Sequence, residues 1–217
     1  MTVKRQEIGA GSMKLKDRSF RELRQQYIYL AVPELAVQLE NIFEQAQQAT
    51  GVLCYCYLEH NKGLQLEVLC CAAFNVEQHS LKLFAGNEVK TVRVAYESVS
   101  EAEAVLLPQN LPRLAEFKSK VAATEVFCAA DAALEKTRQL TALDHLRKAE
   151  QPDDVLVHLV HGECVEKVYV RLTGVNELQL YGTLVGEPQG DFAVHAGEQL
   201  SFYLVKNAQG IMCLAMV

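Results

Sequence analysis

The chain has no tryptophan and only five prolines among its 217 residues. It also has no apolar run of about 18 residues, the length that a membrane-spanning helix needs. The first twenty residues are polar and charged, without the apolar segment and cleavage site of a secretory signal. We therefore expect neither a membrane span nor a signal peptide.

The motifs of the common catalytic centres are missing as well. There is no Gly-x-Ser-x-Gly elbow, no His-Glu-x-x-His and no Cys-x-x-Cys. Gly9-Ala10-Gly11 lacks the following Lys and the preceding strand of a phosphate loop. We accordingly assign no catalytic residue, no metal ligand and no cofactor. Whether the protein is an enzyme stays open, with the balance against it.

Seven cysteines are present, an odd number that includes the adjacent pair Cys70-Cys71. This is no secreted disulfide framework, so we predict a cytoplasmic protein. Cys54 and Cys56 would lie on one face of a strand, as small buried side chains. Zinc binding or redox chemistry by these thiols, and a nucleophilic role for Cys128, are the alternatives.

The net charge of −6 is unevenly distributed. Residues 1–24 carry seven basic and three acidic side chains, whereas residues 153–217 carry eight acidic and three basic ones. Because phosphate backbones require a positive surface, the acidic C-terminal region is a poor platform for nucleic acid. We expect a protein partner of unknown identity, no nucleic acid and no membrane, and we make no prediction of the oligomeric state.

Helical signals begin after a flexible basic arm at residues 1–16, where Met13 is an alternative start. Ser19-x-x-Glu22 has the spacing of a capping box, and the helix that it opens is expected to run to Leu30. Pro33 then opens a second helix, which ends at Thr50-Gly51. Strands are predicted next at residues 52–58, 64–73, 81–84 and 88–96, with loops at 59–63 and 85–87.

Helices are predicted again in the middle of the chain. Residues 100–124 should form two short helices and residues 131–149 a longer one, before the polar linker Gln151-Pro152-Asp153-Asp154. This order predicts an α+β protein, with an N-terminal helix/antiparallel-sheet/helix domain followed by a small all-β barrel-like domain. The predicted boundaries are 1–16 for the arm, 17–150 for the α+β domain and 155–217 for the small antiparallel barrel.

The C-terminal region alternates apolar and polar residues. In residues 168–173, Val168, Val170 and Leu172 share one face of a strand, and Tyr169 and Arg171 share the other. Further strands are expected at 178–185, 199–205 and 211–217, separated by turns rich in Gly, Pro and Asn. Short strands in such a series favour a small barrel or curled sheet, with the last seven residues as a buried strand.

Three short motifs in this region resemble a bacterial family known as domain of unknown function 2314. They are Tyr169-Val170-Arg171, then Gly182-Thr183-Leu184 with Glu187-Pro188, and then Gly197-Glu198 with Ser201-Phe202. The resemblance covers residues 163–204, although the family has Trp at the position of Tyr169 and Asn at that of Gly186. It implies a bacterial source and a fold, but no activity, since the family has no settled function.

A candidate recognition patch consists of Tyr169, Arg171 and Glu187, because Pro188 stiffens the loop that holds the Glu187 carboxylate. Ordinary surface charges are the alternative interpretation of Arg171 and Glu187. We expect a non-catalytic protein-interaction module of an accessory or immunity-like kind. The alternative function is an enzyme or small-ligand binder with a pocket between the two domains.

Overall fold

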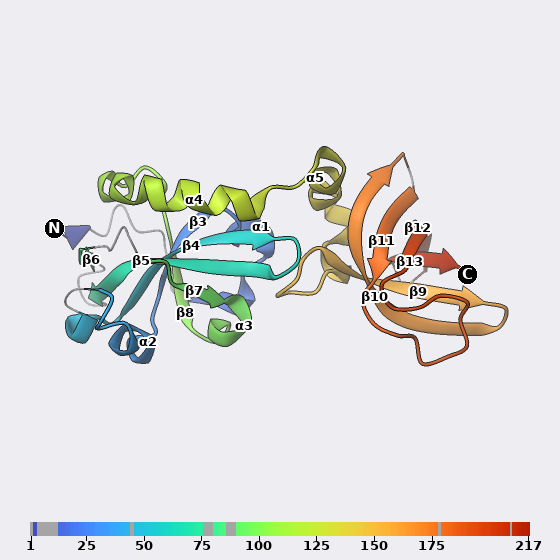
Figure 1. Ribbon diagram of the computed structural model, residues 1–217, viewed down its shortest axis with the longest axis horizontal. Helices are drawn as coiled ribbons and strands as arrows, with labels where there is room; N and C mark the ends of the chain where they lie inside the picture. Colours follow the sequence, from blue (N-terminus) through green and yellow to red (C-terminus); the bar gives the residue numbers. More distant parts are fainter. Residues whose placement is uncertain are drawn as a thin grey trace. The chain divides into compact units, whose positions relative to one another are not determined.

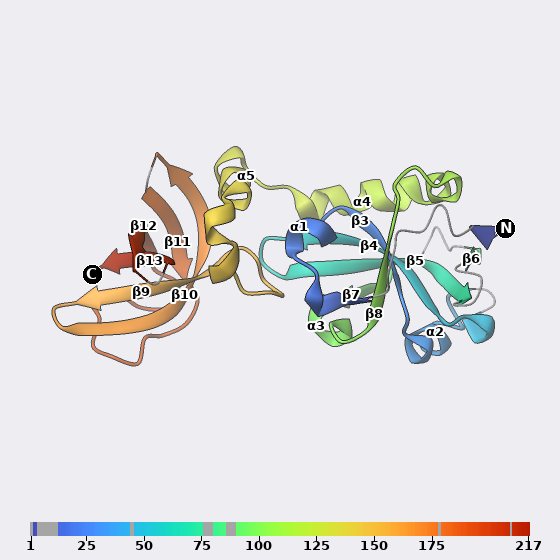
Figure 2. The same ribbon diagram turned by 180° about the vertical axis from the view of Figure 1, so that it is seen from behind.

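In the computed structural model, the chain folds into two compact units, Met1–Ala129 and Ala130–Val217 (Figures 1 and 2). Among the residues that it describes, no helix has the length and apolarity needed to cross a membrane. The described residues are 2–3, 13–43, 46–75, 80–85, 90–177, 179–208 and 210–217.

Unit 1 contains an eight-stranded antiparallel sheet with the order β1-β6-β5-β4-β3-β8-β2, and β7 pairs with β5. Its longest pairing is the hairpin of β4 and β5, which confirms the predicted hairpin with a shorter loop. The strands are β1 Thr2–Val3, β2 Met13–Lys14, β3 Gln26–Leu30, β4 Gly51–Glu59, β5 Gly63–Asn75, β6 Ser80–Leu83, β7 Arg93–Ala95 and β8 Glu103–Leu107.

Helices cover both faces of this sheet. In Figure 1, α4 runs along one face, and α2 and α3 lie on the other. Along β4, Cys54 and Cys56 face the core that contains α1 to α3, whereas Leu53 faces the core that contains η4. The helical segments are η2 Leu15–Asp17, α1 Phe20–Leu23, α2 Pro33–Gln38, η3 Ala46–Gln48, α3 Tyr96–Val99, η4 Pro112–Phe117 and α4 Lys118–Cys128.

Two segments predicted to be helical are strands. The Ser19–Glu22 capping box forms, but α1 ends at Leu23 and Gln25 has φ of 60°. Gln26–Leu30 then becomes β3, and Glu103–Leu107 becomes β8. Four of the five residues of β3 are buried, so its apolar run carries no alternation that would distinguish a strand from a helix. The predicted order of helix, sheet and helix is therefore not observed.

Both described parts of the predicted flexible arm at residues 1–16 pair with the sheet. Thr2–Val3 pairs with β6 and Met13–Lys14 pairs with β8, and Leu15 is fully buried, so these residues belong to the folded unit. Residues 4–12 of the arm lie outside the described residues, as does most of the predicted turn at 85–87. The strand predicted at 88–96 is observed as the short β7, and its first two residues are also outside the described part.

Unit 2 is a closed five-stranded barrel with the order β10-β11-β12-β13-β9, which confirms the predicted barrel but not its all-antiparallel pairing. Consecutive strands are antiparallel, and β13 closes the barrel by pairing with β9 in parallel. An odd number of alternating strands requires this, because the last strand then runs in the direction of the first. The strands are β9 Asp154–His161, β10 Cys164–Asn176, β11 Gln179–Leu184, β12 Gln199–Asn207 and β13 Gly210–Met216.

Two helical segments that we assigned to the first domain pack on the barrel. They are α5 Ala132–Gln139 and η5 Thr141–Leu146, and Leu134, Leu143 and Leu146 join the barrel core. The unit boundary lies at Ala129–Ala130, whereas the predicted linker at residues 151–154 is buried. Its acidic residues are inside because Arg138 and Arg171 pair with them.

Limited proteolysis should therefore cut near Ala129, which is exposed and lies outside any helix or strand. With elastase, which cleaves after small residues, we expect two stable fragments that separate between Cys128 and Asp131. Mass spectrometry of the fragments identifies the site. First cleavage within residues 151–154 would contradict the burial of that segment.

Candidate interaction surface

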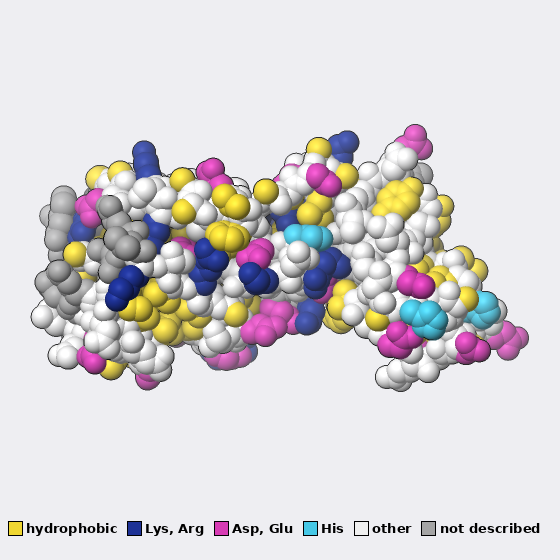
Figure 3. All heavy atoms as spheres, viewed as in Figure 1, with side chains coloured by type: hydrophobic (Ala, Val, Ile, Leu, Met, Phe, Trp, Pro, Cys, Tyr) yellow, Lys and Arg dark blue, Asp and Glu magenta, His cyan; other side chains and the backbone are white. Residues whose placement is uncertain are grey.

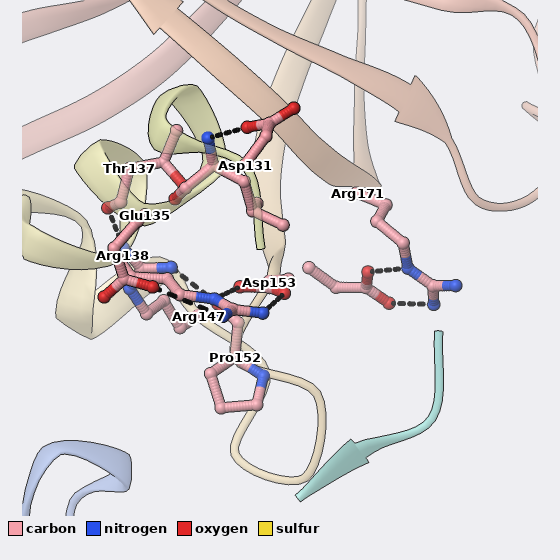
Figure 4. A network of polar contacts seen from close by, with 10 residues as sticks. Asp131, Glu135, Thr137, Arg138, Arg147, Pro152, Asp153 and Arg171 are labelled. Atoms are coloured by element: carbon pink, nitrogen blue, oxygen red, sulfur yellow. Dashed lines mark hydrogen bonds and ion pairs between the residues drawn. The ribbon is translucent and has the colours of Figure 1, made fainter. Parts of the chain in front are cut away.

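A network of buried charges joins α5 to the segment before β9 (Figure 4). Arg138 donates from Nε and Nη2 to the two carboxylate oxygens of Asp153, at 3.0 and 2.7 Å. Both side chains are buried, with 1% and 0% exposed. Arg147 donates to the carbonyl oxygens of Thr137 and Pro152, each at 2.6 Å. These groups hold the helical segments against the barrel, so we interpret the network as structural.

Arg171, one of the predicted site residues, is also used internally. Its guanidinium donates to the Asp154 carboxylate at 2.7 and 3.1 Å, and the two residues are direct cross-strand neighbours on β10 and β9. Tyr169 lies two residues earlier on the same outward face and is 39% exposed. Tyr169 and Arg171 thus share a face as predicted, but the Arg171 charge is already neutralised.

Glu187 fixes the loop that contains it. Its carboxylate accepts hydrogen bonds from the Ala196 backbone N–H at 2.9 Å and from His195 Nδ1 at 2.6 Å. The backbone bond and the His195 contact lower the pKa of Glu187, and Glu187 in turn raises the pKa of His195. These contacts lie within the loop between β11 and β12. That Glu187 joins Tyr169 in one recognition patch stays a prediction.

The same loop is anchored to the barrel at two further points. The Glu166 carboxylate accepts from the backbone N–H groups of Gln189 and Gly190, at 2.9 Å for the shortest bond to each. Phe192 is only 5% exposed and belongs to the barrel core. The loop is therefore an ordered part of the barrel that closes over the core.

The outer surface of the barrel carries apolar side chains where polar ones are usual. Met216 on β13 is the lateral neighbour of Val160 on β9, which is paired in turn with Val165 on β10. Tyr203 on β12 is paired with Leu214 on β13. We call this surface the outer apolar band. Its members are Leu156, Val160, Val165, Tyr169, Tyr203, Val205, Met212, Leu214 and Met216.

Several members of the band are well exposed. The exposed fractions are 71% for Met216, 61% for Val165 and 49% for Tyr203. Among the described residues, the exposed large apolar side chains outside unit 2 are Met13, Val37 and Val126, which belong to separate elements of unit 1. Unit 2 thus holds most of these side chains, and cross-strand pairing joins those of the band, whereas Tyr181 is paired with Ser201 and lies outside it.

Acidic groups accompany the apolar ones on the barrel. Figure 3 shows Asp, Glu and His side chains gathered at one end of it, beside apolar side chains. Glu163 and Asp191 are exposed, and so is Lys167, which shares the outward face of β10 with Tyr169 and Arg171. Between the apolar rows of the band, the outward positions of β10 and β9 hold Lys167 and His158, which are cross-strand neighbours, and His158 lies beside Leu214. The barrel sequence is acidic overall, but the band itself contains this polar pair.

The cysteines offer little chemistry. Cys54, Cys56, Cys70, Cys71 and Cys213 are buried, Cys128 is intermediate and Cys164 is exposed. Burial raises the pKa of Cys71 to about 11 and that of Cys213 to about 12, so both thiols stay protonated and poorly nucleophilic. In the described part of the chain, no group of three or more His, Cys, Asp or Glu side chains is arranged to hold a metal ion.

The comparisons with family models, curated proteins and solved structures return no match. The resemblance of residues 163–204 to domain of unknown function 2314 therefore stays a prediction. Of the residues that the surface brings together, sequence reasoning singled out Tyr169 and missed Tyr203, Val165 and Met216. Their outward positions follow from strand alternation, but their contiguity depends on the register of four strands.

Proposed function

We propose that the barrel is a non-catalytic protein-interaction module that binds its partner through the outer apolar band. The contiguous row of Met216, Val160 and Val165, with the Tyr203–Leu214 pair beside it, carries this proposal. Exposed apolar patches of this kind mark interaction sites on proteins in water. Tyr and Met are also enriched at interfaces, where large side chains exclude water from the contact.

Charge favours one kind of partner. Residues 153–217 carry eight acidic and three basic side chains, and three of these, Asp153, Asp154 and Arg171, are engaged in internal ion pairs, which leaves six acidic and two basic ones. A second copy of the barrel would bring the same excess of negative charge to the contact. The acidic excess of the barrel instead favours a protein whose contact area combines apolar side chains with Lys and Arg. Such a partner would also be steered towards the barrel.

Substitution of the band tests this proposal. We expect Tyr203→Ser with Met216→Ser to weaken partner binding at least tenfold, since truncation of a central interface residue typically costs about 2 kcal/mol or more. The full-length protein would capture its partner from source cells, and calorimetry with the purified partner would give the affinity. Both side chains are substantially exposed, so folding should be unaffected.

Val126→Ser in unit 1 is the matched control, because Val126 is 79% exposed and lies outside the band. Its affinity should equal that of the unsubstituted protein. The association rate should fall as salt is raised if the partner is basic. Equal affinity of the band variant and the control would refute the proposed surface. If the protein instead forms a dimer, and the band variant is monomeric, the proposal of a basic partner protein would be refuted.

A further inference from the structure

In the described part of unit 1, four buried side-chain polar atoms have no hydrogen-bond partner, and two of them are close in the sheet: Oη of Tyr57 and Oε1 of Glu67. Tyr57 is 0% exposed and Glu67 is 1% exposed. In the β4–β5 hairpin, Tyr57 is paired with Gln65 and Tyr55 with Glu67. Tyr57 and Glu67 are therefore diagonal neighbours whose side chains leave the same face of the sheet.

Helix α4 and strand β7 enclose these two side chains. Phe127 of α4 packs its ring against that of Tyr57, with centroids 6.4 Å apart. The guanidinium of Arg93 on β7 lies 3.9 Å from the Phe127 centroid and donates from Nε to Glu67 Oε2 at 3.2 Å. Lys120 of α4 donates to the Val68 carbonyl oxygen at 3.0 Å. Aromatic and cationic groups thus lie beside these two side chains.

Burial shifts the pKa values of Tyr57, Glu67 and Lys120. It raises the pKa of Tyr57 to about 12, so the phenol stays protonated and keeps a hydrogen-bond donor. It also raises the pKa of Glu67, although hydrogen bonds from Arg93 and from the Val92 backbone and the charge of Lys120 act to lower that pKa. Burial lowers the pKa of Lys120. Buried polar atoms are nearly always satisfied in folded proteins, because an unmade bond forfeits hydration without compensation.

We propose that Tyr57 Oη and Glu67 Oε1 form an internal binding site under α4 for one small neutral molecule with both a donor and an acceptor. The carboxylate oxygen requires a donor, and the phenol offers an O–H and a lone pair. A cation would meet Arg93 and Lys120, and an anion would meet Glu67, so neither ion fits. Water is the smallest molecule that has both a donor and an acceptor, and a small alcohol or amide is the alternative occupant. This site is independent of the proposed barrel function.

Tyr57→Phe tests the site through stability. If the hydroxyl binds a ligand, its removal should lower the urea concentration at which unit 1 is half unfolded. Hydrogen exchange of peptides from β4 and β5 measures this midpoint. An unsatisfied hydroxyl would give the opposite result, because replacing it with hydrogen relieves a buried orphan and leaves the midpoint unchanged or higher. That outcome would overturn the proposal.

Tyr29→Phe is the matched control. Tyr29 is 2% exposed, lies in the same sheet, and its Oη is 2.7 Å from Thr50 Oγ1. It therefore gives the fall in midpoint expected when a satisfied buried hydroxyl is removed. Tyr57→Phe should produce a comparable fall.

A crystal structure of the unsubstituted full chain at high resolution supplies the second measurement, free of any folding defect. Electron density within hydrogen-bond distance of both Tyr57 Oη and Glu67 Oε1 is expected. Native mass spectrometry then distinguishes the occupants, because an organic ligand adds a reproducible mass that is lost on activation and an ordered water does not. A direct contact between the two side chains, or no density there, would refute the site.

Discussion

Arg138→Met is expected to lower the free energy of unfolding of the barrel unit by about 3–5 kcal/mol, the usual cost of removing one partner of a buried ion pair. The Asp153 side chain is 0% exposed, so the substitution leaves a carboxylate without water and without its cation. Hydrogen exchange of peptides from β9 to β13 measures the loss within unit 2. The chain has no tryptophan, so circular dichroism is the better optical probe.

Two variants separate the charge effect from loss of packing. Glu135→Gln removes a carboxylate that is 3.5 Å from Arg138 but 35% exposed, and it should cost less than about 1 kcal/mol. Arg138→Met with Asp153→Leu removes both charges and should restore much of the loss, because apolar residues can replace a buried pair at little cost. If Arg138→Met alone is as stable as Glu135→Gln, the Asp153 carboxylate must find other partners or water in the variant, and the expected cost would be refuted.

The strands of the barrel could be predicted because each has one buried face. Val168, Val170 and Leu172 point inward and are at most 8% exposed, while Tyr169 and Arg171 point outward. This alternation fixes both the strand and its register, since a slip by one residue would expose the whole apolar set. Strands covered on both faces give no such signal, and β3 and β8 were accordingly predicted as helix.

Long-range pairing explains the other differences. Asp153 and Asp154 have the local character of an exposed linker, and only the fold brings Arg138 and Arg171 to them. Met216, Val160 and Val165 are likewise ordinary strand residues in sequence. Their contiguity depends on parallel closure between β13 and β9, which composition and spacing do not specify. The candidate surface was therefore predictable at Tyr169, but its extent was not.

Deletion of residues 211–217 should unfold the barrel or make the protein insoluble. β13 is paired with β12 on one side and with β9 on the other, so its loss opens two strand edges at once. The inward side chains lost are Cys213 and Ala215, which are small, and the larger cost lies in the two backbone ladders. Each ladder hydrogen bond contributes about 0.5–1.5 kcal/mol, so the sum is comparable with the about 5–15 kcal/mol that stabilises a whole domain.

Met216→Ser is the control for this deletion, because Met216 belongs to the same strand and is 71% exposed. The point variant should elute like the unsubstituted protein and unfold cooperatively, whereas the deletion should aggregate through its open edges or lose exchange protection in β9 and β12. Size-exclusion chromatography and hydrogen exchange provide the comparison. A truncated protein that remains monomeric with protected β9 and β12 would mean that closure is dispensable. The free edges could then pair with a partner's strand, which would become the preferred mode of binding.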